Sequence, residues 1–407
     1  MAPLTLGCAT TERAKMSVSY WQDTAGQRSS HAVDVLIIGA GLAGLSTAYW
    51  LNKKEPGLKI AIVDKGPIGN GASGRNAGFI TCGSTEHFSR MTSAYGEDKA
   101  SEIWKFTEDN HKLVVSEFGK DKLTEFCEYR SLGSWTLAAT QNEIDVIGET
   151  VDKLAKKGIN VKWYPEKHVK EKMLCEGFFG GAYYGDDGEI HPMKFLNYLR
   201  AHCPNTQVFQ NSEVFAIEEQ EAGNLKVRCR LLDFHTPAIV LATNAWSGQL
   251  DNFFADKIAP TRGQIIVTEP IAPFLEPSYC SFVLDYFRQL VDGRVLIGGF
   301  RNADVEREVG FSDEVNPIIN EKLEGFLHKH FPILRGKKID YRWSGVMGFA
   351  ADGYPMVGSL PHNPSIYYAV GFTAHGLGFT FKIGQVLADL MLEGKDPGIF
   401  SGRRFGR

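Results

Sequence analysis

The chain has 407 residues, of which 43% are hydrophobic and 23% charged, and its formal net charge is −4. This composition is typical of a globular protein that can bury a large core, and the weakly acidic balance argues against recruitment by nucleic acid. Every apolar run is shorter than the roughly 18 to 20 residues that cross a bilayer. We therefore predict no membrane span and a small-molecule substrate.

Residues 1–30 are predicted to be an N-terminal lead-in. The short apolar stretch APLTLGC has no basic residues before it, which argues against a secretory signal and predicts a cytoplasmic protein. Met16 is a second possible start of translation, and the sequence leaves the choice between Met1 and Met16 open. The seven cysteines are scattered without a C-x-x-C pair, which predicts reduced thiols and no metal site.

A glycine-rich turn follows the first buried strand. Residues 35–38 form a continuous apolar run, typical of a strand covered on both faces, and G-x-G-x-x-G leads from it into a helical pattern. The first glycine makes the turn, the second lets backbone approach a pyrophosphate, and the third allows close helix packing, with the phosphates at the helix N-terminus. The predicted contacts are Gly39, Gly41, Leu42, Ala43 and Gly44.

A second strand, residues 59–63, ends on Asp64, 20 residues after Gly44. An acid at about this spacing accepts hydrogen bonds from a ribose, so we predict an ADP-containing cofactor with Asp64 and Lys65 beside it. The glycine-rich loop that follows can lie against a second half of the cofactor, although a surface loop is the simpler alternative. Its predicted contacts are Gly71, Ala72, Ser73, Arg75, Asn76, Ala77 and Gly78.

The rest of the chain alternates helical and strand patterns. A charged helix is expected within residues 97–122, a strand near 130–140, a helix after His191-Pro192 and a pair of hairpin strands in 208–234. A buried strand at 238–241 ends in small and polar residues that could abut a ring system or could simply end a strand. Three more strands are expected between 262 and 300. Glycines at 371–378 then precede an amphipathic helix whose N-terminus could polarise the electron-rich edge of a flavin.

Several of these segments together resemble a known family. GASGRNAGF, AIVLATNAWS, DGYPMVG and YYAVGFTAHGLGFTFKIG are similar to segments of the FAD-dependent amine and amino-acid oxidoreductases of the D-amino-acid oxidase (DAO) type. SYWQDTAG is similar to the lead-in of the gamma-glutamylputrescine oxidase branch, and the overall pattern resembles that branch and the sarcosine oxidase-like proteins. The resemblance spans residues 17–395.

The resemblance implies an α/β fold in which a Rossmann-like FAD-binding domain is interleaved with a mixed-sheet (α+β) substrate domain. The FAD domain would comprise residues 31–85, 190–248 and 340–395, the substrate domain 86–189 and 249–339, and the C-terminal tail 396–407. The further FAD contacts that it implies are Val214, Ala242, Thr243, Asn244, Trp246, Gly345, Gly371, His375, Gly376, Leu377 and Gly378.

The implied reaction is oxidation of a C–N bond, in which a hydride passes to flavin N5 and the imine hydrolyses, with O₂ or another acceptor reoxidising the flavin. Arginine pairs with carboxylates in a bidentate manner, so Arg288 and Arg301 are candidate substrate clamps, with structural ion pairs as the alternative. His375 is the third catalytic candidate. Tyr286 and Trp343 could form an aromatic wall for an aliphatic amine or could simply pack in the core.

Two departures from the family bear on the chemistry. The strand in RVLIGGF lacks the oxygen-activating lysine of some sarcosine oxidase relatives, which leaves oxidase and dehydrogenase activity open. RWSGVMGFAADG lacks a tethering cysteine and GASGRNAGF a tethering histidine, so we expect noncovalent FAD. Oxidation of a hydroxy acid or polyol phosphate, and a non-catalytic FAD-binding subunit, remain alternatives. Substrate, pathway and oligomeric state stay open.

Overall fold

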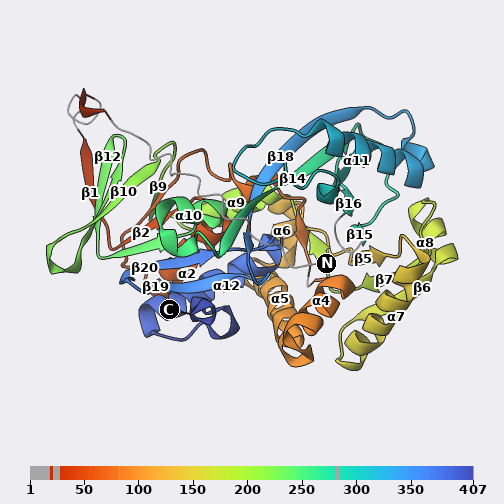
Figure 1. The fold of residues 1–407 in the computed structure, drawn as a ribbon, viewed down its shortest axis with the longest axis horizontal. Helices are drawn as coiled ribbons and strands as arrows, with labels where there is room; N and C mark the ends of the chain where they lie inside the picture. The colour runs from red at the N-terminus through yellow and green to blue at the C-terminus, as the bar shows by residue number, and fades with distance from the viewer. Residues whose placement is uncertain (1–18, 22–27, 82, 281–284, 407) are drawn as a thin grey trace.

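The structure is a computed structural model that describes residues 19–21, 28–81, 83–280 and 285–406. Three larger sheets follow one another along the long axis, with a four-stranded sheet at one end, a six-stranded sheet next to it and an eight-stranded sheet at the other end (Figure 1). Most of the predicted lead-in lies outside the described residues, and so do both possible start methionines, Met1 and Met16. The mixed α/β fold class predicted from the sequence is confirmed.

The six-stranded sheet has the order β19-β20-β13-β2-β3-β9. All neighbours from β20 to β9 are parallel, and β19 pairs antiparallel with β20. β2 and β3 are buried along their whole length, because helices cover one face of the six-stranded sheet and the four-stranded sheet packs against the other. The strands are β2 (Val35–Ile38), β3 (Ile60–Val63), β9 (Thr206–Phe209), β13 (Ala238–Leu241), β19 (Met356–Leu360) and β20 (Asn363–Val370).

Two helices that begin at the glycine-rich turns pack against each other beside this sheet. These are α2 (Leu42–Lys54) and α12 (Gly376–Glu393), both of which the glycine patterns predicted. A Cβ at Gly384 would lie 2.7 Å from Ser46, so the glycine permits a close approach of the two helices. α5 (Glu97–Phe118) and α9 (Pro192–Ala201) confirm the other predicted helices.

The four-stranded sheet has the order β1-β12-β11-β10. β10 and β11 pair antiparallel, which confirms the predicted hairpin, and β1 joins β12 in parallel. The bounds are β1 (Ser29–Ala32), β10 (Val214–Glu219), β11 (Leu225–Cys229) and β12 (Leu232–Thr236).

The eight-stranded sheet has the order β18-β14-β17-β16-β15-β5-β7-β6. Its strands are β5 (Ser134–Leu137), β6 (Val161–Pro165), β7 (Gly180–Tyr184), β14 (Ile258–Thr268), β15 (Ser278–Cys280), β16 (Asp285–Gln289), β17 (Val295–Gly298) and β18 (Ile339–Ala350). The helices α7 (Gln141–Lys156), α8 (Glu166–Met173) and α11 (Pro317–His330) pack against its strands, whereas α4 (Thr85–Tyr95) and α6 (Lys120–Cys127) pack against α5. β4 (Phe79–Ile80) and β8 (Gly188–Glu189) form a separate two-stranded sheet.

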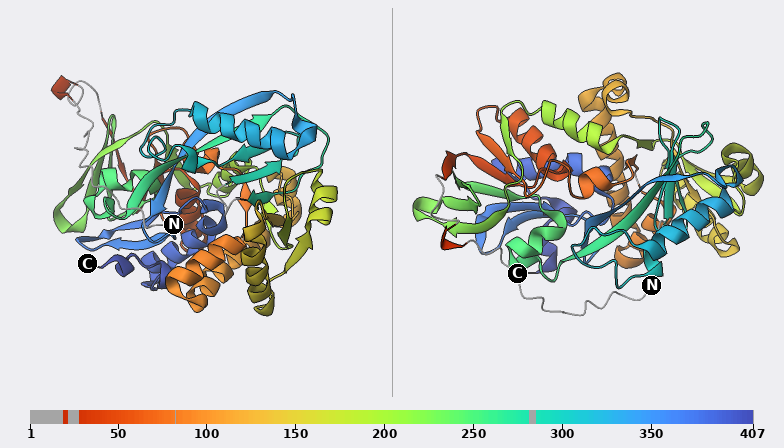
Figure 2. Two further views of the ribbon diagram at one scale, coloured as in Figure 1. Left: turned by 45° about the vertical axis from the view of Figure 1, so that its right-hand side comes forward. Right: turned by 90° about the horizontal axis from the view of Figure 1, so that it is seen from above.

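The turned views separate the region of the six-stranded sheet from that of the eight-stranded sheet (Figure 2). β18 continues the eight-stranded sheet as far as Ala350, so this sheet crosses the domain boundary predicted at residue 340. The domain division itself stays a prediction. Among the described helices, none combines the length and the apolar character that a bilayer crossing requires.

Candidate functional site

Four segments predicted to bind the cofactor meet at one edge of the six-stranded sheet. Gly39, Asp64, Ala242 and Gly371 each come directly after a parallel strand, namely β2, β3, β13 and β20. Parallel strands place their carboxyl ends at the same edge, which is where ligands bind in open α/β sheets. The parallel pairing therefore explains why segments more than 300 residues apart converge.

The glycine turn leaves no room for side chains. Gly39 has φ +115°, and a Cβ there would lie 2.5 Å from the Ala242 carbonyl oxygen. A Cβ at Gly44 would lie 2.0 Å from the carbonyl oxygen of Gly39. The turn therefore exposes bare backbone at the N-terminus of α2, the geometry that approach by a pyrophosphate needs.

Asp64 is held by the turn that it follows. Its Oδ2 accepts a hydrogen bond from the Ala40 N–H (2.7 Å) and its Oδ1 one from the Gly66 N–H (2.8 Å). Burial raises the pKa of Asp64, and the two N–H donors oppose that rise. The neighbouring Lys65 ammonium lies 4.1 Å from the centroid of the Trp246 ring.

Val214 reaches the same edge through the backbone. The Ser212 N–H donates to the Asp64 carbonyl (2.7 Å), and β10 begins two residues later at Val214. Val214 is buried. The chain therefore brings this predicted contact close to the end of β3.

The loop of residues 71–78 connects the glycine turn to the eight-stranded sheet. Ser73 Oγ accepts from the Leu42 N–H (2.9 Å) at the start of α2. Arg75 donates to the Ser344 carbonyl (2.9 Å) and pairs with Asp313 (3.1 Å), and its own carbonyl accepts from Trp343 Nε1 (3.0 Å). Trp343, one of the two residues predicted to form an aromatic wall, is thus fixed against the predicted cofactor loop.

The other residues of this loop are also closely packed. The short helix α3 (Ala72–Arg75) forms its middle, and a Cβ at Gly345 on β18 would lie 3.0 Å from the Arg75 Cβ. Asn76 Oδ1 accepts from the Gly78 N–H (2.8 Å). Ala77 is buried in an apolar cluster with Phe79, Tyr279 and Leu296, against which Tyr286 and Trp343 pack. A Cβ at Gly71 would lie 3.8 Å from the Trp246 ring.

The turn before α12 is strained and is supported from β13. Thr373 (φ 47°) and Ala374 (φ 64°) both adopt left-handed backbone, which costs energy for residues other than glycine and clusters at functional sites. Asn244, which follows β13 and Thr243, accepts from the Gly371 N–H (3.0 Å) through its Oδ1. His375 comes next, followed by Gly376, Leu377 and Gly378 in the first turn of α12. The Gly376 and Leu377 N–H groups have no backbone acceptor among the described residues, whereas the Gly378 N–H donates to the His375 carbonyl (3.0 Å).

The two candidate arginines differ in how their charges are balanced. Arg288 is 5% exposed and pairs with the fully buried Glu189, with 3.2 Å between Nη1 and Oε2. Arg130 pairs with the same carboxylate. Burial lowers the pKa of Arg288, and the charge of Glu189 opposes this. The Arg288 charge is therefore already compensated within the protein.

Arg301 is half-buried, and among the described residues none forms an ion pair or hydrogen bond with its side chain. Its guanidinium lies 4.6 Å from the centroid of the Phe349 ring. Burial lowers its pKa, opposed by Tyr286 and Glu308, and burial raises the pKa of Tyr286 to about 12. Phe349 forms a β-bridge with Phe372, which places Arg301 near the turn that carries His375.

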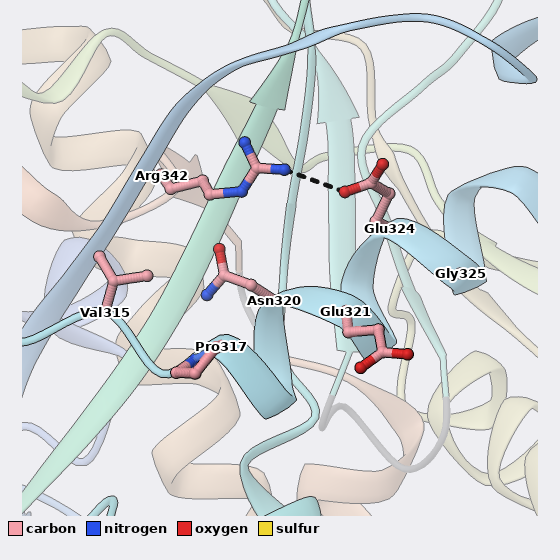
Figure 3. A pocket seen from close by; sticks show the side chains of 7 residues that line it. All are labelled: Val315, Pro317, Asn320, Glu321, Glu324, Gly325 and Arg342. Carbon is pink, nitrogen blue, oxygen red and sulfur yellow. Dashed lines mark hydrogen bonds and ion pairs between the residues drawn. The ribbon is translucent and has the colours of Figure 1, made fainter.

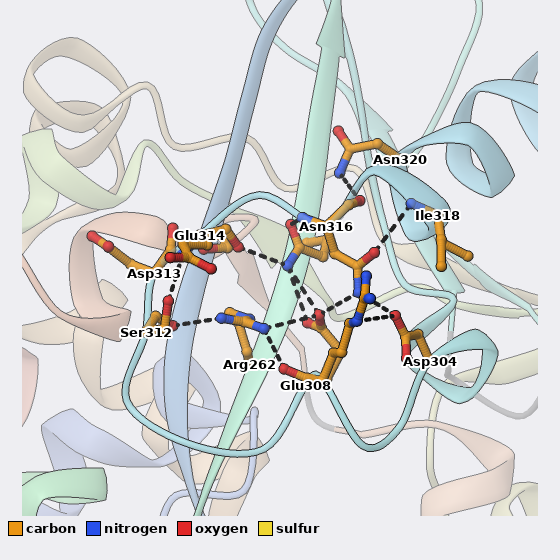
Figure 4. A network of polar contacts seen from close by, with 12 residues as sticks. Arg262, Asp304, Glu308, Ser312, Asp313, Glu314, Asn316, Ile318 and Asn320 are labelled. Atoms are coloured by element: carbon orange, nitrogen blue, oxygen red, sulfur yellow. Dashed lines mark hydrogen bonds and ion pairs between the residues drawn. The ribbon is translucent and has the colours of Figure 1, made fainter.

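A buried polar network anchors the segment that follows Arg301. Glu308 is fully buried and accepts from Gln264 Nε2 (3.1 Å) and Asn316 Nδ2 (3.0 Å), while Arg262 lies 3.4 Å away (Figure 4). Asn316 Nδ2 also donates to Asp304 (2.9 Å). The network ties residues 304–316 to β14, and this segment supplies the Asp313 carboxylate that Arg75 contacts.

A surface cleft of about 550 Å³ lies elsewhere, between α11 and β18 (Figure 3). Arg342 and Glu324 pair across it (2.9 Å). Adjacent residues of a strand point to opposite faces of the sheet, so Arg342 faces away from Trp343 and the glycine-rich edge. The cleft is therefore separate from the converging site. Its lining consists of Val315, Pro317, Asn320, Glu321, Glu324, Gly325 and Arg342.

Residues 34–390 match the family described as DAO, FAD dependent oxidoreductase. The chain belongs to the DAO family. It is similar to the probable oxidoreductase OrdL of Haemophilus influenzae (27% identity, 91% of this chain and 88% of that protein). It is also similar to the gamma-glutamylputrescine oxidoreductase of Escherichia coli (26% identity, 88% and 83%). The crystal structure of glycine oxidase from Geobacillus kaustophilus shares the fold, with a TM-score of 0.76 at 21% identity over 91% of this chain and 98% of that one.

Membership of the DAO family makes the chain an FAD-dependent oxidoreductase of the amine and amino-acid type. The residues present fit FAD: the turn at Gly39 and Gly44 is closed to any Cβ, and the start of α12 offers N–H donors for an electron-rich ring edge. The predicted FAD contacts converge at this edge, and their individual roles stay predictions.

Sequence reasoning missed the residues that support the site from other elements. Asn110 on α5 donates to the Leu377 carbonyl (3.0 Å) and accepts from the Lys382 N–H (2.9 Å), fixing the first two turns of α12. Glu189 balances the charge of Arg288, and the Arg301 guanidinium lies over the Phe349 ring. No local pattern marks these residues, because their importance arises only from packing between distant segments.

Proposed function

We propose that the chain oxidises the C–N bond of a small amine or amino acid that carries a carboxylate, such as an N-methyl amino acid or a gamma-glutamyl polyamine. The observation that carries this proposal is Arg301, a half-buried guanidinium with no ion-pair partner among the described residues, beside Phe349 and Tyr286. A guanidinium in such surroundings gains a strong bidentate contact from a substrate carboxylate.

Each residue then has a distinct task. Arg301 binds the carboxylate, and the apolar surface of Phe349 and Tyr286 excludes water and disfavours the charged form of the substrate amine. Arg288, whose charge Glu189 already balances, supports the loop at Gly78 rather than the substrate. Noncovalently bound FAD supplies the electron-accepting chemistry at the carboxyl edge of the six-stranded sheet.

The reaction is tested by anaerobic visible spectroscopy of the FAD-loaded protein. The panel consists of N-methyl amino acids, D-amino acids and gamma-glutamyl polyamines, with the corresponding decarboxylated amines and 2-hydroxy acids as matched comparisons. We expect carboxylate-bearing amines to bleach the oxidised-flavin band and the decarboxylated amines to do so poorly. Bleaching by hydroxy acids alone would move the assignment to C–O oxidation, and a flavin that no compound bleaches would indicate a non-catalytic FAD-binding protein.

Admission of air after bleaching identifies the electron acceptor. Rapid recovery of the oxidised band would indicate an oxidase. The described strand β17 (Val295–Gly298) contains no lysine, so we propose slow recovery and a separate acceptor. A cytoplasmic location likewise remains a proposal from the sequence.

A further inference from the structure

Two histidine rings from distant parts of the chain stack beside the proposed flavin site. His87 lies in α4 and His375 immediately precedes α12, with ring centroids 4.8 Å apart and planes inclined by 13°. We propose that His87 is a positioning residue whose buried ring fixes the ring of His375 at the N-terminus of α12, next to the flavin. This inference rests on the flavin placement proposed above.

The burial of His87 is the first argument. The residue is 5% exposed, and its Nε2 has no hydrogen-bond partner in the described part of the chain. A buried polar atom without a partner is costly, so it calls for a compensating role. The backbone of His87 is well fixed, because its N–H donates to the Ser84 Oγ (3.1 Å) that caps α4. The fixed backbone and the burial of the ring together restrict its movement.

The turn that carries His375 is the second argument. Two consecutive left-handed residues, Thr373 and Ala374, aim the chain so that His375 lies over His87. The Asn244 side chain and the β-bridge at Phe372 hold this strained turn in place. Strain of this kind persists only where the surrounding structure determines it. The first N–H groups of α12, which the flavin edge would face, follow directly.

The pKa shifts of the two histidines favour their uncharged forms. Burial lowers the pKa of His375 to about 4, with a smaller contribution from the charge of Arg90. Burial, followed by His375 and Arg90, lowers the pKa of His87 well below its ordinary value. Among the described side chains, no carboxylate counteracts these shifts. Both rings are therefore neutral well below physiological pH, and His87 contributes to this by covering one face of the partly exposed His375 ring.

The test follows the visible spectrum of the FAD-loaded protein, without substrate, as pH changes. In the native chain we expect no transition between about pH 5 and 7, because His375 is already neutral there. His87→Ala would admit water, the pKa of His375 would move toward about 6.5, and a flavin spectral transition would appear in this range. His87→Phe preserves a stacked ring and should restore the flat profile.

His330→Ala is the matched control, because His330 has the same 5% exposure and stacks at 4.7 Å on Phe178, which belongs to a different apolar cluster from Leu377 of α12. It should leave the profile flat. A flat profile in His87→Ala, or a transition in His87→Phe equal to that in His87→Ala, would overturn the inference.

Histidine NMR titration of the FAD-free chain, with His375→Gln for assignment, supplies an independent readout. An unchanged His375 pKa in His87→Ala would also overturn the inference. A raised His375 pKa in His87→Ala, together with failure of the native chain to take up FAD when FAD is added, would support the stacking role while rejecting the flavin placement. Failure of every amine to bleach the flavin would reject only the proposed reaction.

Discussion

Arg288 and Glu189 form a buried ion pair directly behind the predicted cofactor loop. The Arg288 Nη1 lies 3.2 Å from Glu189 Oε2, and a Cβ at Gly78, where φ is +80°, would lie 2.5 Å from the Arg288 Nη2. The Arg288 Nη2 also donates to the Ile190 carbonyl (3.2 Å). The pair thus braces the loop through its backbone, which is a structural task distinct from substrate binding.

The first prediction concerns the stability that this pair provides. Arg288→Met leaves Glu189 buried with only Arg130, and breaking a buried pair typically costs at least about 3 kcal/mol. We expect the free energy of unfolding in urea to fall by about 3 kcal/mol. Arg342→Met, which breaks an exposed pair with Glu324, should cost less than about 1 kcal/mol. Equal losses in the two variants would contradict the structural role of Arg288.

The second prediction separates Arg301 from Arg288 by kinetics. Arg301→Met removes a charge-assisted contact of about 2 kcal/mol, so KM for a carboxylate-bearing amine should rise about thirtyfold. The decarboxylated amine should show little change. Arg307→Met, which removes an exposed guanidinium from the neighbouring segment, is the control and should resemble the native chain. A KM that rises equally for both amines would show that Arg301 does not bind the carboxylate.

Arg288 and Arg301 show which features of the site can and cannot be predicted from the sequence. Strand β2, the glycine turn and Asp64 are predictable because their signals are local, namely an apolar run, a fixed glycine spacing and an acid at the next strand end. The sequence could not predict which of Arg288 and Arg301 has its charge already balanced by the protein. That depends on Glu189 and Phe349, which contact these arginines only in the folded chain. The course of β18 across residue 340 was missed for the same reason, since pairing with β14 decides it.

The third prediction addresses the glycine turn. Gly44→Ala would place a Cβ 2.0 Å from the Gly39 carbonyl oxygen, so helix α2 must shift at a cost of about 1 to 3 kcal/mol. Because the cofactor is expected to contact this backbone, we expect the dissociation constant for FAD, measured by flavin fluorescence, to rise at least about tenfold. Gly57→Ala has no atom within 4 Å of the new Cβ and should bind FAD like the native chain. Tight FAD binding by Gly44→Ala would disprove this placement of the cofactor.

The fourth prediction concerns acid sensitivity. His111 is buried, its Nε2 lies 2.8 Å from the Tyr129 hydroxyl, and burial lowers its pKa to about 4. The folded state therefore favours the neutral ring, so this contribution to stability is complete above about pH 6.5 and is lost as pH falls toward 4. A shift of this size corresponds to at most about 3 kcal/mol.

His111→Gln retains a group that can bond Tyr129 but removes the titration. Its free energy of unfolding, measured in urea at several pH values, should fall less steeply between about pH 6.5 and 4 than that of the native chain. His235→Gln, which removes a partly exposed imidazole, is the control and should keep the native slope. The prediction concerns the slope alone, because the substitution also changes packing and so lowers stability at every pH. An unaltered slope in His111→Gln would show that this ring is not the source of the acid sensitivity.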